Sequence, residues 1–159
     1  MFYPAQIGGE MGQFDSNRFR SSNQEWETPD EIFEPLNREF GFTLDVAASN
    51  DNHKCQRYFT EKDDALSKPW DSEVCWLNPP YKQTKLWMKK AYEESWNGVV
   101  CVCLIQARTN TNWWHDYCMK GEVRFIRGRP KFKGCKHGLP QPLAIIIFGK
   151  RGNNSGTPF

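Results

Sequence analysis

The sequence predicts an α/β fold with a mostly parallel sheet and a C-terminal antiparallel hairpin. Three observations predict it. First, segments with the apolar pattern of strands alternate along the chain with segments that have the periodicity of helices. Second, the run VVCVCLI at 99–105 is apolar throughout, which is typical of a strand buried on both faces of a parallel sheet. Third, the apolar strands expected at 122–126 and 143–148 have no helix-length connection between them, so they can pair as an antiparallel hairpin.

The chain is expected to form one folded domain, at 25–150, because 159 residues suffice for a single core. Residues 1–24 and 151–159 are polar or Gly-rich and show no period, so a flexible arm and a flexible tail are expected there. No apolar run reaches the roughly 20 residues of a membrane span, and the N-terminus has no signal-peptide pattern. A cytoplasmic protein with no membrane partner is therefore expected, and no obligate protein partner is evident.

The first helix is expected to begin at Thr28. Thr28 would be its N-cap, Pro29 its first helical residue and Glu31 the last member of a capping box, and Gly41 would end it. The other expected elements follow in chain order: short strands at 42–47 and 57–59 around a turn or short helix at 50–54, a buried strand at 73–78, a helix at 85–96, the strand 99–105, a helical segment at 113–119, and the strands 122–126 and 143–148.

The motif NPPY at 78–81 directly follows a buried strand. Because Pro79 and Pro80 each hold the preceding residue extended, the carbonyl groups of Asn78 and Pro79 have fixed directions. The Asn78 side chain adds another carbonyl acceptor, and Tyr81 places a flat ring beside it. Such a rim fits a planar heterocycle that carries an amino group. The alternative is a tight strand-to-helix turn with Tyr81 in the core.

The net charge of +2 conceals an asymmetry. Residues 1–81 carry 7 Lys/Arg against 15 Asp/Glu, a net of −8, whereas 82–159 carry 14 against 4, a net of +10. The segment 124–136, RFIRGRPKFKGCK, contains no acid. This favours an anionic partner such as nucleic acid, unless the two halves intermix in space and their charges cancel.

The cysteines do not indicate a disulfide framework or a metal site. Cys75, Cys101 and Cys103 lie in apolar segments and are interpreted as reduced core residues. The pairs His-x-Cys at 53–55 and Cys-x-His at 135–137 have a tighter spacing than the usual zinc pairs, so no metal is predicted.

As a set, these motifs resemble the phage-type (Dam-like) DNA N6-adenine methyltransferase family. The resemblance covers about residues 26–148 and rests on four segments: WETPDEIFEPLNREFGFTLDVAASNDNHKCQRYFTEKDDAL, LNPPY, ARTNTNWWHD and EVRFIRGRPKF. In amino-methyltransferases that act on adenine N6 or cytosine N4, NPPY is the catalytic motif, with Asp, Asn or Ser in its first position. The resemblance implies a compact Rossmann-like sheet that binds S-adenosylmethionine and methylates adenine N6 in DNA.

The resemblance also implies roles for the motif. Asn78 and the Pro79 carbonyl, held in place by Pro80, would accept the two hydrogens of adenine N6. Tyr81 would stack on the flipped base. Because the donor is a positively charged sulfonium, direct displacement needs no general base, and catalysis would consist largely of positioning.

The residues that the resemblance assigns to the cofactor lie before, at and after the first strand: Trp26, Thr28, Pro29, Asp45, Ala47, Asp63 and Asp64. Asp45 would meet the methionine portion, and Ala47 would let the cofactor approach closely. The segment around Thr28 would close over the cofactor, with helix capping as the other role of Thr28. One carboxylate of 63–64 would hold the ribose or adenine, unless this stretch is a solvated acidic turn.

The residues expected to grip DNA phosphates are basic or polar and follow the later strands: Arg108, Thr109, Arg127, Arg129, Lys131 and Lys133. The alternative for the group at 127–133 is a solvated charged loop. The neighbouring tryptophans, Trp113 and Trp114, are interpreted as core or pocket wall rather than as platforms for bases.

The sequence departs from the usual methyltransferase pattern in two ways. The Gly-rich first motif is replaced by LDVAAS, and only 33 residues separate Asp45 from Asn78, where two more strands with helices usually fit. A helix or strand is therefore expected to be missing there. Three other activities stay open: N4-cytosine methylation, glutamine-amide methylation of protein, and nucleic-acid binding without catalysis. The basic segment 124–136 argues against a protein substrate, and the intact Asn78 and Tyr81 argue against lost catalysis.

Overall fold

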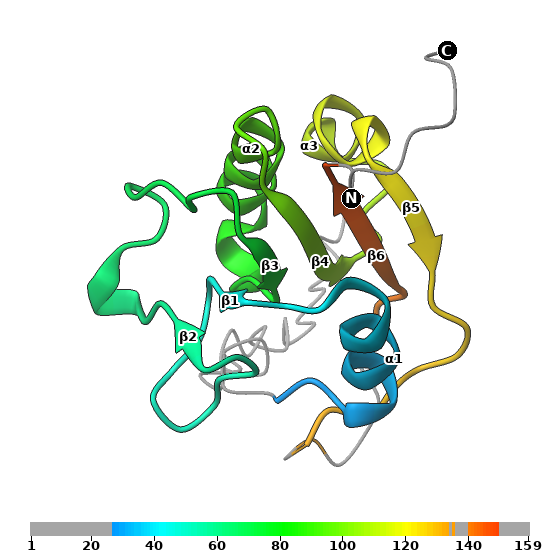
Figure 1. The fold of residues 1–159 in the computed structure, drawn as a ribbon. Helices are drawn as coiled ribbons and strands as arrows, with labels where there is room; N and C mark the ends of the chain where they lie inside the picture. Colours follow the sequence, from blue (N-terminus) through cyan, green and yellow to red (C-terminus); the bar gives the residue numbers. More distant parts are fainter. Residues whose placement is uncertain (1–26, 134, 136–139, 150–159) are drawn as a thin grey trace, which may run out of the picture.

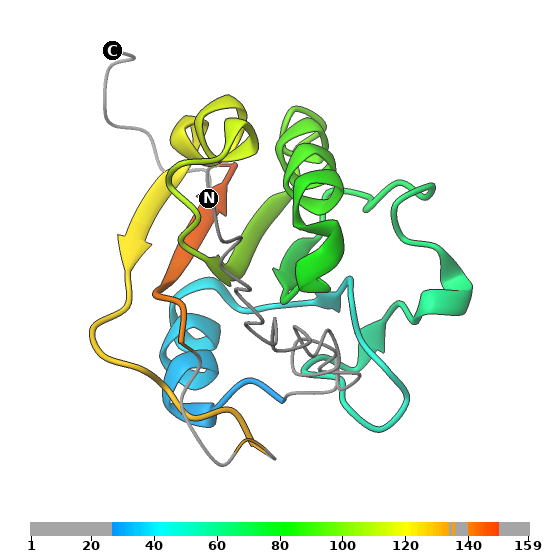
Figure 2. The same ribbon diagram turned by 180° about the vertical axis from the view of Figure 1, so that it is seen from behind.

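The computed structural model describes residues 27–133, 135 and 140–149. The expected arm at 1–24 and tail at 151–159 lie outside the described residues. Within them, a mixed sheet lies between two layers of helices (Figures 1 and 2). This arrangement confirms the predicted α/β class.

The sheet has six strands in the order β2-β1-β3-β4-β6-β5. Its strands are β1 Leu44–Asp45, β2 Arg57–Tyr58, β3 Val74–Leu77, β4 Val100–Gln106, β5 Glu122–Phe125 and β6 Leu143–Phe148. The pairs among β2, β1, β3 and β4 are parallel, whereas β6 runs antiparallel to both β4 and β5. The mostly parallel sheet with its antiparallel C-terminal strands is therefore confirmed.

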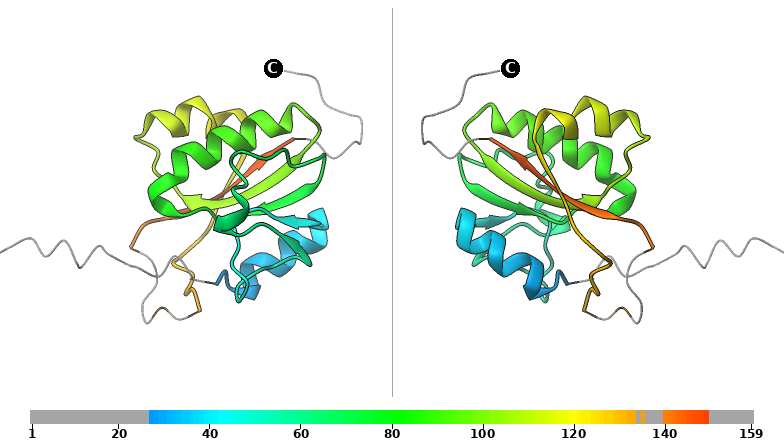
Figure 3. Two further views of the ribbon diagram at one scale, coloured as in Figure 1. Left: turned by 90° about the vertical axis from the view of Figure 1, so that its left-hand side faces the viewer. Right: turned by 90° about the vertical axis from the view of Figure 1, so that its right-hand side faces the viewer.

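Helices cover both faces of the sheet, as Figure 3 shows from the side. Helix α1 (Asp30–Phe40) packs on one face through Phe33, Leu36 and Phe40, while α2 (Thr84–Ser95) and α3 (Asn112–Asp116) cover the other. The described residues also form three short 3-10 helices, η2 Glu61–Asp63, η3 Tyr81–Gln83 and η4 Cys118–Lys120. Because both faces are covered, β4 is buried along almost its whole length, as its apolar run predicts.

The start of α1 differs from the prediction. The N-cap is Pro29, whose carbonyl accepts hydrogen bonds from the backbone N–H groups of Ile32 and Phe33 at 3.0 and 3.1 Å. Thr28 makes no capping hydrogen bond and is only 2% exposed, so the predicted capping box is wrong. Gly41 ends the helix as predicted, with a φ of 67° that suits glycine.

The half of the sheet before β3 is short. The strand expected at 42–47 is only Leu44–Asp45, because the Asp45 side chain accepts a hydrogen bond from the Ala47 N–H and bends the chain there. Between β1 and β3, a stretch described throughout, the chain forms only β2 and η2 and no α-helix. The predicted loss of an element in this half is confirmed.

The strand pairing brings the functional candidates to one side of the sheet. We call this side the carboxyl edge, formed where β1, β3, β4 and β5 end at Asp45, Leu77, Gln106 and Phe125. The opposite side is the amino edge. In the register, Asp45 pairs with Trp76, and Leu77 pairs with Cys103. The segments that follow the strand ends therefore lie close to one another.

Candidate active site

The NPPY motif leaves the end of β3 as a stiff turn. Pro79 is buried, and Pro80 has φ −56° and ψ 125°, so the backbone stays extended until Tyr81 begins η3. The Thr84 hydroxyl donates a 3.0 Å hydrogen bond to the Tyr81 carbonyl and ties the turn to the start of α2. The motif therefore stands at the carboxyl edge between a buried strand and a helix, as predicted.

The side-chain amide of Asn78 is held by Thr28, fifty positions earlier in the chain. Asn78 Nδ2 donates a 3.3 Å hydrogen bond to Thr28 Oγ1, and Thr28 is almost completely buried. With its NH₂ group turned toward Thr28, the amide presents Oδ1 on its other side. No described residue donates a hydrogen bond to that oxygen, so it is available as an acceptor for a ligand.

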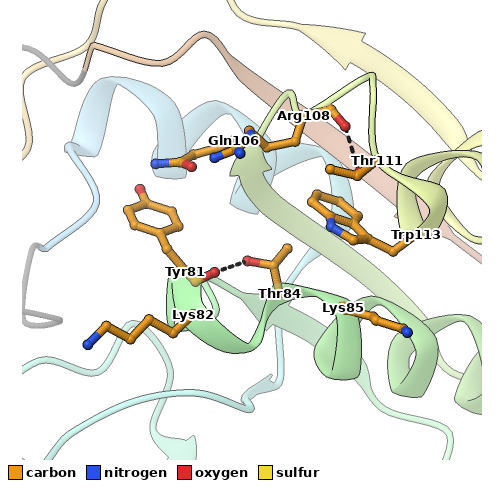
Figure 4. A pocket seen from close by; sticks show the side chains of 8 residues that line it. All are labelled: Tyr81, Lys82, Thr84, Lys85, Gln106, Arg108, Thr111 and Trp113. Carbon is orange, nitrogen blue, oxygen red and sulfur yellow. Dashed lines mark hydrogen bonds between the residues drawn. The ribbon is translucent and has the colours of Figure 1, made fainter. Parts of the chain in front are cut away.

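A cavity of about 190 Å³ opens beside Tyr81 (Figure 4). One side comes from the segment after β3 and the other from the segment after β4, and the lining residues are Tyr81, Lys82, Thr84 and Lys85 opposite Gln106, Arg108, Thr111 and Trp113. Burial raises the pKa of the Tyr81 phenol to about 12, so the ring is neutral at physiological pH. The cavity therefore combines two flat rings with several cations.

Asp45 is a buried carboxylate at the end of β1. It is 3% exposed, and it accepts hydrogen bonds from the Ala47 and Lys54 backbone N–H groups at 3.3 and 2.9 Å. Burial raises its pKa to about 6, although these hydrogen bonds act in the opposite direction. At neutral pH it is a negative charge without full compensation, which suits a cationic group on a ligand.

The other residues assigned to the cofactor lie in different settings. Pro29 is buried and Ala47 is half-buried, whereas Trp26 lies outside the described residues. The Asp63 carboxylate accepts hydrogen bonds from the Thr60 N–H and hydroxyl at 2.7 and 2.8 Å, which lower its pKa and cap η2. Asp64 is exposed at the end of η2. These contacts agree with the alternative of an acidic turn.

Lys133 already has anionic partners. Its ammonium lies 2.9 Å from Glu27 Oε1 and 3.4 Å from Asp30 Oδ2, and Lys54 pairs with the same two carboxylates. The hydrogen bonds from Lys54 and Lys133 lower the pKa of Glu27. These pairs fasten the end of the basic segment to the start of α1, so Lys133 is less available to a phosphate than the sequence suggests.

Helix α1 provides another carboxylate, that of Glu39, which pairs with a basic residue of the second half of the chain. Arg124 makes a bidentate pair with Glu39, with Nη–Oε distances of 2.7 and 2.8 Å, and also pairs with Glu122. Part of the positive charge of the second half of the chain is thus neutralised by carboxylates of the first half.

Other basic candidates have no ion-pair partner among the described residues. Arg127, Arg129 and Lys131 are exposed, and no carboxylate of the described residues pairs with any of them. They follow β5 at the carboxyl edge. Arg108 lines the cavity, while exposed Thr109 accepts a 2.8 Å hydrogen bond from His115 Nε2 through its carbonyl.

Sequence reasoning missed three lysines near the site. Lys82 and Lys85 line the cavity, and Lys54 connects Asp45 to Glu27 through its backbone and side chain. The sequence could have revealed Lys82 and Lys85, because two residues three positions apart at the start of a helix lie on one side of it. The role of Lys54 could not be read from the sequence, since its contacts depend on the tertiary fold.

The described residues show neither a metal-binding cluster nor a membrane-spanning helix. The described residues contain no cluster of three or more His, Cys, Asp or Glu that could hold a metal ion, and His137 lies outside them. None of the helices in the described parts of the chain has the length and apolarity to cross a membrane.

Comparison with known proteins links this geometry to one enzyme family. The sequence model described as "DNA N-6-adenine-methyltransferase (Dam)" matches residues 15–145, which is most of the chain. Two phage proteins with the name DNA N-6-adenine-methyltransferase are similar. The one from Escherichia phage T1 is 32% identical over 93 residues, and the one from Haemophilus phage HP1 is 29% identical over 114. These matches cover 57% and 70% of this chain but only 39% and 65% of the phage proteins.

A third similar protein is shorter. The putative methyltransferase YfdM of Escherichia coli K12 is 35% identical over 79 residues, which is 45% of this chain and 87% of that protein.

Proposed function

The chain belongs to the DNA N6-adenine methyltransferase (Dam) family, and from this premise we propose that it transfers a methyl group from S-adenosylmethionine to adenine N6 in DNA. The observation that carries the proposal is the orientation of Asn78. Its NH₂ group is turned to Thr28, so its carbonyl oxygen is available at the carboxyl edge, three residues before Tyr81 in the NPPY turn. An acceptor beside a flat ring suits an aromatic amine that has been flipped out of a duplex.

Asn78 and Pro79 would act on the substrate amino group. Their carbonyl oxygens accept the two N6 hydrogens, which localises the nitrogen lone pair and points it at the methyl group. Tyr81 stacks on the base and fixes its plane. The donor would supply the methyl group to N6 and leave as a neutral thioether, and the extra proton of N6 would pass to solvent.

Asp45 would hold the cofactor. S-adenosylmethionine supplies the methyl group from a positively charged sulfonium, and its methionine part carries an ammonium. The buried carboxylate of Asp45 is a fitting partner for that ammonium, because two backbone N–H groups and the weaker attraction of His53 and Lys54 offset the cost of burying the charge only in part. Asp45 lies one strand away from β3, whose end carries Asn78.

The direct test is transfer of labelled methyl from S-adenosylmethionine to duplex DNA, followed by separation of the product nucleosides. Label in N6-methyl-2′-deoxyadenosine supports the proposal, and label in N4-methyl-2′-deoxycytidine would reassign the base. Absence of label in either nucleoside, with cofactor binding shown by calorimetry, would leave a nucleic-acid-binding protein without catalysis. Label in protein glutamine would identify the amide-methylating alternative.

The substitution Thr28→Val is expected to lower kcat about tenfold, with little change in KM for DNA. Valine keeps the shape of threonine but removes the hydroxyl, so the Asn78 amide loses the partner that orients it. Thr28→Ser should restore most of the rate. The matched control is Thr43→Val at the amino edge, which removes a hydroxyl bonded to Glu73. Equal rates in Thr28→Val and Thr43→Val would remove this positioning role.

Charge reversal at Arg127 and Arg129 is expected to weaken DNA binding and flatten its salt dependence. Each lost phosphate contact reduces the magnitude of the slope of log K against log salt by about 0.9, so the slope of the double variant should be smaller by about two or more. Binding is measured by fluorescence anisotropy over a range of salt. The control reverses Arg38 and Lys120, two exposed cations toward the amino edge. A slope equal to that of the control would remove this segment from the DNA surface.

A further inference from the structure

Phe125 is an exposed aromatic residue at the carboxyl edge. It is the last residue of β5 and 71% exposed, although burial of a phenyl ring is favourable. Single exposed apolar side chains are common on proteins, so exposure alone carries no conclusion. The surroundings of Phe125 distinguish it from the other large exposed apolar residues, Leu86, Trp96 and Met119.

The register places Phe125 level with the active site. Phe125 pairs with Ala144 of β6, and Ala144 pairs with Ile105 of β4, one residue before the cavity-lining Gln106. Three strand spacings separate β5 from β3, or about 14 Å at about 4.8 Å each. This distance equals about four base-pair steps of B-DNA at about 3.4 Å each. A duplex with its target base beside Tyr81 can therefore reach Phe125.

Aromatic rings connect Phe125 to the cavity. Its ring stacks on Trp114, with centroids 6.5 Å apart and planes at 19°, and Trp114 packs against Trp113 at 6.3 Å. Trp113 lines the cavity beside Tyr81. Because Trp114 is 2% exposed and fixed in the core, it supports the Phe125 ring from behind and keeps its other face toward solvent.

The charge around Phe125 favours a polyanion. The residues that follow include Arg127, Arg129 and Lys131, all exposed and without a carboxylate partner among the described residues. An apolar ring beside cations that bind phosphate is the combination with which proteins insert a side chain between base steps and unstack them. A protein partner that buried Phe125 would need carboxylates to compensate these charges, whereas the phosphates of DNA supply negative charge along their whole length.

We propose that Phe125 inserts between stacked bases of the DNA substrate, a few base pairs from the flipped adenine. This inference rests on the proposed function, because it assumes that the target base lies beside Tyr81. The inserted Phe125 ring would help to unstack the bases next to the target, while Arg127 and Arg129 bind the nearby phosphates.

The test compares Phe125→Ala with Trp96→Ala. Trp96 is the matched control, because it is 70% exposed and packs against one ring, Tyr92, but lies after α2 at the amino edge. By fluorescence anisotropy, Phe125→Ala should bind a duplex about tenfold more weakly than the wild type, as expected for a lost stacking contact. Trp96→Ala should bind within about twofold of the wild type.

A second measurement reports insertion itself. 2-Aminopurine, whose fluorescence rises on unstacking, replaces each adenine of the duplex in turn. Wild-type protein should raise the signal at one position near the target, and Phe125→Ala should abolish that rise. An unchanged affinity in Phe125→Ala, or no position whose signal depends on Phe125, would overturn the inference. Methyl transfer by the wild type is measured separately, so a failure of the proposed function is recognised independently.

Discussion

Substitution of Asn78 by alanine is expected to lower the rate of methyl transfer at least about a hundredfold, while the dissociation constant for S-adenosylmethionine changes by less than about threefold. The Asn78 side chain supplies one of the two acceptors for the adenine amino group, and its geometry is fixed by the proline that follows and by the hydrogen bond to Thr28. Without it, the base can still stack on Tyr81, but its nitrogen is no longer aligned with the methyl group. An error of about an ångström can cost about a hundredfold in rate.

Single-turnover transfer of labelled methyl to DNA measures the rate, and calorimetry measures cofactor binding. The informative comparison is Asn78→Asp, because a carboxylate keeps an acceptor oxygen and can accept a hydrogen bond from the Thr28 hydroxyl. This variant should lose less activity than Asn78→Ala. Loss of cofactor binding together with turnover in Asn78→Ala would mean that Asn78 belongs to the cofactor site or to the core, and the assignment would be wrong.

The carboxyl edge was predictable from local sequence because its parts are encoded locally. An apolar strand that ends at NPPY, and another that ends at Asp45, bring their last residues to one side of any parallel sheet. The same argument applies to Arg108, which follows the next strand and lines one cavity with Tyr81. None of these conclusions required knowledge of how distant segments pack.

The contacts that refine the site depend on such packing. Thr28 was expected to cap a helix, but the fold instead brings its hydroxyl to Asn78, fifty residues away, and Pro29 serves as the N-cap. Lys133 has the sequence context of a phosphate contact, yet it lies between Glu27 and Asp30. Side-chain partners across long sequence separations are set by tertiary structure, and neither periodicity nor motif spacing reports them.

Substitution of Asp45 by asparagine is expected to weaken binding of S-adenosylmethionine about thirtyfold or more. The buried carboxylate would lose its charge, and the ammonium of the ligand would face a neutral amide, a loss that typically costs about 2 kcal/mol or more in a buried setting. Binding is measured by calorimetry at neutral pH. Asp71→Asn is the matched control, because Asp71 is an exposed carboxylate before β3 at the amino edge and should bind the cofactor as the wild type does.

The pH dependence gives this prediction a second readout. Burial raises the pKa of Asp45 from 3.8 to about 6, so the unliganded protein takes up a proton there as the pH falls through about 6. Only the charged carboxylate pairs with the ammonium, so affinity is full above this pH and falls about tenfold for each unit below it. Asp45→Asn has no such proton to gain, and its weaker binding should stay level between about pH 5 and pH 7.

The same shift has an opposite consequence for the stability of the unliganded fold. Because the folded state prefers protonated Asp45, this residue contributes stability that is fully present below about pH 3.8 and is lost as the pH rises through about 6. The ammonium of the cofactor thus needs the charged form of Asp45, which burial disfavours in the protein without ligand. Binding should therefore stabilise the protein more at pH 7.5 than at pH 5.5. A thermal shift with S-adenosylmethionine that is equal at both values, or larger at the lower one, would show that Asp45 does not face the ammonium.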